Sequence, residues 1–140
     1  MIVDAQNQLS LKQSATTGTQ VSQNAIDLTQ VGRDVSRNGK LRLVITIDTA
    51  YAAGTSLDFQ LIGSAAANLG SPTVLYDSLA IPVANLTKGA KVVDVLLPPT
   101  PLEFLGVQTI AVGTFTGGAH TASIVIDTDQ NKFYTSVTGY

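Results

Sequence analysis

The sequence contains no cysteine and no tryptophan, and it has a single histidine. The absence of cysteine excludes disulfides and zinc sites built on thiolates. The aromatic residues are four phenylalanines and four tyrosines. This is little material for a platform on which sugars or nucleic-acid bases could stack.

Charge is also scarce, because charged residues make up 13% of the chain, about half the usual ~25% of soluble domains. The net charge is −2, and the only loose basic cluster is interrupted by Asp34; its members are Arg33, Arg37, Lys40 and Arg42. A nucleic-acid-binding surface needs a basic stripe. We therefore expect this cluster to be a solvated loop and expect no nucleic-acid partner.

No apolar run approaches the ~18 residues that are needed to span a bilayer. No basic segment followed by an apolar stretch opens the chain, so no signal peptide is visible and we expect no membrane partner. The apolar content must then lie in a core, in an interface or in both. Large assemblies are one setting that suits such a chain.

Short segments of alternating polarity indicate strands. In Leu41–Asp48 and Ser56–Ile62, apolar and polar residues alternate with the period of two that half-buried strands show. Further strands are predicted over Gln20–Leu28, Thr73–Ser78, Ala90–Leu97, Phe104–Val112 and His120–Asp127, and a single helical turn within Ile81–Gly89. The fold class predicted is all-β: one jelly-roll-like β-sandwich or barrel of about eight short antiparallel strands.

The ends of the chain are more polar than its middle. We expect residues 1–19 to form a polar N-terminal arm, residues 20–127 the β-sandwich domain, and residues 128–140 a C-terminal tail. The arm could contact a partner, or it could cover an edge strand of its own domain. Its candidate contact residues are the apolar Ile2, Val3, Leu9 and Leu11, and those of the tail are Phe133, Tyr134 and Tyr140.

The segment Gly113–Ala119 separates the last two predicted strands. A glycine-containing loop between two strands predicts a β-hairpin, with Gly117 and Gly118 at positive φ. His120 would then be a turn or strand-edge residue. Near the tip of the hairpin, we predict that Thr114, Phe115 and Thr116 contact a neighbouring molecule.

Motifs for catalysis or metal binding are not recognisable. His120 is the sole imidazole base, and no G-x-S-x-G nucleophile elbow or phosphate-binding glycine loop occurs. The D-x-D-x-N spacing at 127–131 opens some calcium loops, but Lys132 and Thr138 stand where glycine and glutamate are needed. Nothing singles out a catalytic pair of carboxylates. We therefore expect no enzymatic activity, no metal and no cofactor.

Several segments, taken in order, resemble the small cement, or decoration, proteins of tailed-phage heads. They are MIVDAQNQLS, IDL at 26–28, GKLRLVI at 39–45, SPTVLYDSLAIPVANLTKG at 71–89, and then LPP, FLG and GTFTGGAHTASIVID. The resemblance implies a jelly-roll-like fold without catalysis. It also implies binding to the outside of an assembled capsid, where such proteins staple neighbouring capsomers against DNA pressure.

The partners implied are the major capsid protein and further copies of this chain. A homodimer is favoured because two-fold symmetry is the commonest closed symmetry, with a trimer as the alternative. The protein would be made in the host cytoplasm and located on the outer surface of the virion capsid. Two other functions stay open: a carbohydrate-binding or host-adhesion β-module, and a small β-fold hydrolase that uses His120.

Overall fold

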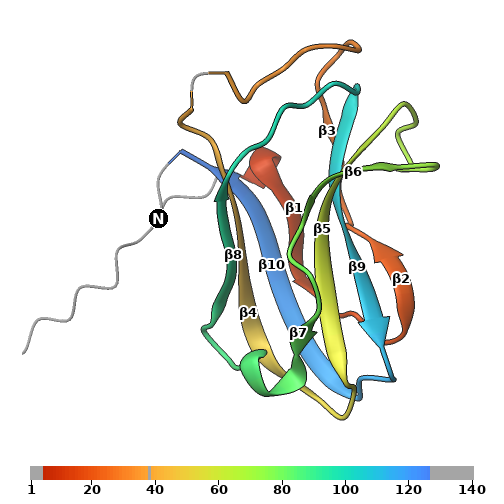
Figure 1. The fold of residues 1–140 in the computed structure, drawn as a ribbon, viewed down its shortest axis with the longest axis vertical. Helices are drawn as coiled ribbons and strands as arrows, with labels where there is room; N and C mark the ends of the chain where they lie inside the picture. The colour runs from red at the N-terminus through yellow and green to blue at the C-terminus, as the bar shows by residue number, and fades with distance from the viewer. Residues whose placement is uncertain (1–4, 38, 127–140) are drawn as a thin grey trace, which may run out of the picture.

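The computed structural model describes residues 5–37 and 39–126. Two 3₁₀ turns, η1 (Ala5–Asn7) and η2 (Val83–Asn85), are the helical elements of this part of the chain, and neither could cross a membrane. All other elements are strands (Figure 1): β1 (Gln8–Gln13), β2 (Gly18–Val21), β3 (Ile26–Asp27), β4 (Arg42–Ala52), β5 (Ser56–Ser64), β6 (Thr73–Asp77), β7 (Ile81–Pro82), β8 (Lys91–Leu96), β9 (Phe104–Val112) and β10 (Gly117–Val125).

The strands form two antiparallel sheets packed as a sandwich, which confirms the predicted all-β fold. Sheet A has the order β1-β10-β4-β8, and sheet B has the order β2-β9-β5-β6 with β3 beside β9 and β7 beside β5. The chain changes sheet six times: between β1 and β2, β3 and β4, β4 and β5, β7 and β8, β8 and β9, and β9 and β10. Such connections are typical of jelly-roll-like sandwiches rather than of simple meanders.

The inner faces of both sheets follow the alternation that the sequence shows. In β4, Leu43, Ile45 and Ile47 are buried, and their partners on β10 share that face. In β5, the buried residues of the inner face include Leu57 and Phe59. These side chains form one continuous core between the sheets.

For its described residues the expected N-terminal arm is part of the sandwich, because residues 8–13 form β1 and pair with β10. Of the two alternatives for this segment, covering an edge strand of its own domain is confirmed for residues 8–13. Leu9 is fully buried in the core, so it is not available to contact a partner. Register shifts between Gln8 and Gln13 interrupt the strand. For this reason the segment shows no sustained period of two, although it belongs to the sheet.

The outer edge of β1 is closed by polar groups from the segment that follows β2. The Leu11 amide donates to Gln23 Oε1 at 3.1 Å, and the Asn24 amide donates to the Leu9 carbonyl at 2.9 Å. Gln13 Nε2 donates to the Val21 carbonyl at 2.8 Å. An edge whose backbone groups are satisfied in this way is a poor template for pairing with another chain.

Two further segments differ from expectation in their boundaries. The predicted strand Gln20–Leu28 is divided into β2 and β3, which both pair with β9. The helical turn expected within Ile81–Gly89 is the short η2, and it follows the two-residue strand β7.

The predicted hairpin between the last two strands is wrong. Strand β9 pairs with β2, β3 and β5, whereas β10 pairs with β1 and β4 in the other sheet. Gly113 has φ +82° and Gly118 has φ +127°, while Gly117 is not at positive φ. The connection is a corner because Phe115 points inward: its side chain is 3% exposed and packs edge-on against Tyr51, with ring centroids 5.2 Å apart.

We expect Phe115→Ala to destabilise the protein by about 3–5 kcal/mol, the usual cost of removing a buried aromatic ring. Urea unfolding followed by circular dichroism measures the change. Val112→Ala, at a 53%-exposed position just before the corner, is the matched control and should change stability little. Equal effects of the two substitutions would contradict the role assigned to Phe115.

Candidate interaction surface

Three connections between the sheets meet at one end of the sandwich: residues 14–17, 53–55 and 113–116. Backbone hydrogen bonds join them, from the Phe115 amide to the Thr16 carbonyl at 2.8 Å and from the Thr116 amide to the Ala52 carbonyl at 3.0 Å. The Thr55 amide donates to the Val112 carbonyl at 2.9 Å. We call these three segments the corner surface.

The corner surface carries no charged residue, since its segments read SATT, AGT and GTFT. Thr16, Thr114 and Thr116 are exposed on it, and Val112 adjoins it with 53% exposure. The charged residues Arg33, Asp34 and Arg37 lie instead in the loop between β3 and β4. The corner surface is therefore neutral, rich in hydroxyl groups and held by backbone hydrogen bonds.

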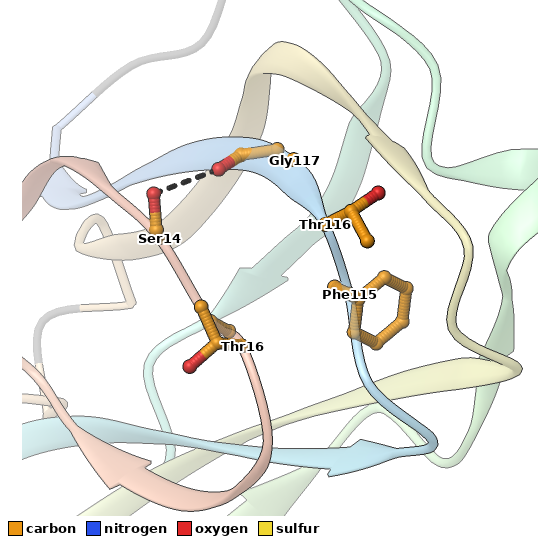
Figure 2. Close-up of a pocket in the computed structure, with 7 residues that line it drawn as sticks. Ser14, Thr16, Phe115, Thr116 and Gly117 are labelled. Atoms are coloured by element: carbon orange, nitrogen blue, oxygen red, sulfur yellow. Dashed lines mark hydrogen bonds between the residues drawn. The ribbon is translucent and has the colours of Figure 1, made fainter.

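A shallow pocket of about 70 Å³ lies between the first and third corners, lined by residues 14–16 and 115–118. Figure 2 shows Ser14 and Thr16 on one side of it and Phe115 and Thr116 on the other. The Ser14 hydroxyl donates to the Gly118 carbonyl at 2.9 Å and ties the two sides together. Pockets for small molecules usually measure about 300–1,000 Å³, so this one has room for a small side chain or a few waters.

Tyr51 and His120 form a buried polar pair directly beneath the corners. The Tyr51 hydroxyl lies 2.7 Å from His120 Nδ1 and 3.5 Å from the Gln13 carbonyl. Burial, with a smaller contribution from the Asp48 charge, raises the pKa of Tyr51, so its phenol stays protonated. The phenol and Nδ1 therefore share one hydrogen bond, whose donor is set by the imidazole tautomer.

The expected place of His120 at a turn or strand edge is wrong. It lies within β10, opposite Ile47, and is 1% exposed. The Phe59 ring packs edge-on against the imidazole at a centroid distance of 5.1 Å. Burial lowers the pKa of His120 to about 4, although the Asp48 charge acts in the opposite direction. The side chain thus fills the core as a neutral imidazole and is not presented to solvent.

Asp58 and Asp77 are neighbouring carboxylates at the β5–β6 edge of sheet B. Burial and the adjacent Asp77 raise the pKa of Asp58, whereas the hydrogen bond from the Leu79 amide lowers the pKa of Asp77. Gln60 Nε2 donates to Asp77 at 3.0 Å, and the Ser78 hydroxyl donates to Asp58 at 3.2 Å. These contacts stabilise the edge, and no group of three potential metal ligands occurs among the described residues.

The predicted contact residues differ in their exposure in the structure. Thr114 and Thr116 are exposed together on the corner surface, and Leu11 is exposed on β1. Phe115 is buried, so its prediction as a contact residue is wrong. Other predictions lie outside the described residues: Ile2, Val3, Phe133, Tyr134, Tyr140, the tail 128–140 and the whole D-x-D-x-N pattern at 127–131.

Ser14 and Thr16 were missed because they fell within the presumed arm. The only signal that could have found them is the run SATTGT, which is free of charge and of large apolar residues. A similar run, AAGT, leads into β5. Nothing in the sequence shows that the two runs lie at the same end of the molecule.

The fold and the corner surface define a small β-sandwich protein whose most distinctive exposed feature is a neutral, preformed end. The Bbp16 family model matches residues 9–124, which is most of the chain, so the chain belongs to the Bbp16 family. Comparison with curated proteins returned no match.

We expect the imidazole of His120 to stay neutral in the folded protein down to about pH 4. NMR titration can measure this directly, because the chain has a single histidine. In the unfolded state His120 takes up a proton near pH 6.5, whereas in the folded state it does so only near pH 4. The free energy of unfolding should therefore fall by roughly 3 kcal/mol as the pH drops from about 6.5 to about 4. His120→Gln should weaken this pH dependence of urea unfolding, and a resonance that titrates near pH 6.5 would contradict the assignment.

Proposed function

We propose that this chain is a structural virion protein that binds the outer surface of a tailed-phage capsid and staples neighbouring capsomers of the major capsid protein. The resemblance to phage cement proteins and membership in the Bbp16 family support the proposal. The observation that carries it is the corner surface, which is neutral and rigid and projects two exposed threonines, Thr114 and Thr116.

The mechanism is stabilisation by mass action. A protein that binds only the assembled and expanded shell stabilises that shell by its binding free energy. Because backbone hydrogen bonds already hold the corners in place, binding costs little ordering of the loops. A homodimer would place two corner surfaces on neighbouring capsomers, and the second contact would gain from being intramolecular.

The proposed role is non-catalytic and located on the virion exterior. The buried imidazole of His120 is consistent with this, since a general base must reach its substrate. A carbohydrate-binding or host-adhesion module finds less support at the corner surface, because its pocket of about 70 Å³ is small for a sugar ring. Co-sedimentation with expanded heads that lack the protein tests the proposal, and saturable binding in a fixed ratio to the capsid protein is expected.

The double substitution Thr114→Glu/Thr116→Glu should weaken binding to heads by about tenfold or more, because unpaired carboxylates would be buried against the shell. Co-sedimentation over a concentration series gives the apparent Kd. Thr73→Glu, at an exposed position on β6, is the matched control and should bind like the parent protein. Both proteins should keep the parent's Tm, and normal binding by the double variant would exclude the corner surface as the contact.

Binding through an uncharged surface should depend little on ionic strength. Raising the salt from about 0.1 M to about 1 M shortens the Debye length from roughly 10 Å to roughly 3 Å. We expect occupancy of heads to change by less than about twofold over this range. Loss of binding at high salt would instead implicate the charged loop between β3 and β4.

A further inference from the structure

One edge of sheet B is formed by β6 and β7, which a turn at residues 78–80 separates (Figure 1). Leu79 lies in this turn with φ +60°, a left-handed conformation that is unfavourable for any residue with a side chain. Its side chain is 71% exposed, so burial does not offset the strain. We call residues 78–80 the edge turn, and we infer that its conformation depends on its hydrogen bonds.

These hydrogen bonds tie the edge turn to β5 and to two carboxyl groups. The Leu79 amide donates to Asp77 Oδ1 at 2.7 Å, and the Ser78 amide donates to the Phe59 carbonyl at 2.9 Å. The Ser78 hydroxyl accepts the Phe59 amide at 3.0 Å. The same hydroxyl lies 3.2 Å from Asp58 Oδ1 and 2.9 Å from the Leu79 carbonyl. A side-chain oxygen thus replaces a backbone carbonyl in the ladder, and Asp58 and Asp77 hold it from either side.

No cationic side chain of sheet B balances these two acids. The strands of this sheet contain no lysine, arginine or histidine, and η2 and residues 65–72 carry no titratable group. The other titratable residues of the sheet are Asp27 and Tyr76. Asp27 pairs with Phe104 at the far end of β9, and Tyr76 packs against the core. Asp58 and Asp77 therefore face each other without a counter-ion from the sheet.

The two carboxyl groups are hydrogen-bonded to each other, which requires one proton between them. Burial, followed by the hydrogen bond and the charge of Asp77, raises the pKa of Asp58 above its ordinary 3.8. Its stabilising contribution is therefore lost as the pH rises through the folded pKa. The hydrogen bond from the Leu79 amide lowers the pKa of Asp77 below 3.8, so that contribution is lost only in stronger acid. At neutral pH two like charges remain side by side.

We propose that Asp58 and Asp77 act as a proton-dependent catch for the strained edge turn. The turn is held most tightly when the two carboxyl groups share one proton, and it opens more readily when both are ionised. Opening can stay local, because the exposed Leu79 side chain leaves no cavity in the core when it moves. This device belongs to the free protein and does not rest on capsid binding.

Asp58→Asn tests the catch, because an amide keeps the shape of the carboxyl group and can donate to Asp77 at every pH. The protection factor of the Ser78 amide, measured by NMR hydrogen exchange, reports opening of the turn. In the parent protein it should rise as the pH falls from 7 towards 4, about tenfold for each unit by which the pKa of Asp58 is raised. In Asp58→Asn it should already be high at pH 7 and vary little. The Leu97 amide, bonded to the Leu41 carbonyl of sheet A, is the internal reference and should show no such rise.

Asp27→Asn is the matched control, since Asp27 is an exposed aspartate of the same sheet whose carboxylate accepts the Thr29 amide at 2.7 Å. It should leave the pH dependence of the Ser78 amide unchanged. Carbon-13 NMR titration of the carboxyl groups needs no variant, and Asp58 should titrate above pH 3.8 in a transition that Asp77 also senses. Protection of Ser78 that is independent of pH in the parent, or equally pH-dependent in Asp58→Asn, would overturn the proposal. So would an Asp58 carboxyl that titrates at or below pH 3.8.

Discussion

Phe115 holds the two sheets together at the point where the chain passes from one to the other. Its ring packs against Tyr51, which in turn reaches His120. The packing is so close that only glycine fits at two neighbouring positions. Any side chain at Gly54 would place its Cβ 2.6 Å from the Phe115 ring, and one at Gly118 would collide with Tyr51. Backbone hydrogen bonds tie the corners together around this cluster. Phe115 is bonded to Thr16 and Thr116 to Ala52.

The distribution of polar groups follows from the sandwich and its edges. Glutamine and asparagine side chains close the edge at β1, and Asp58 and Asp77 are bonded into the edge at β6. The three corner segments carry no charged residue, whereas the loop between β3 and β4 carries Arg33, Asp34 and Arg37. A neutral end that needs no ordering is suited to close contact with a preformed shell, where unpaired charges would be costly to bury.

The proposed capsid contact lies on the corner surface, whose geometry is set by the buried packing of Phe115 against Tyr51. The first described strand is also part of the domain, because Leu9 belongs to the core and residues 8–13 pair with β10.

The sequence by itself determined the all-β class and the inward faces of β4 and β5, because a period of two depends only on neighbouring residues. It also identified Thr114 and Thr116 as exposed. Only the tertiary structure decided that GTFTGG is a corner rather than a hairpin, that Leu9 and His120 are buried, and that Ser14 and Thr16 join the same surface. Local glycine and threonine patterns are equally compatible with a hairpin and with a corner. What separates them is whether Phe115 finds a cavity between two sheets, and that cavity is built by strands distant in the sequence.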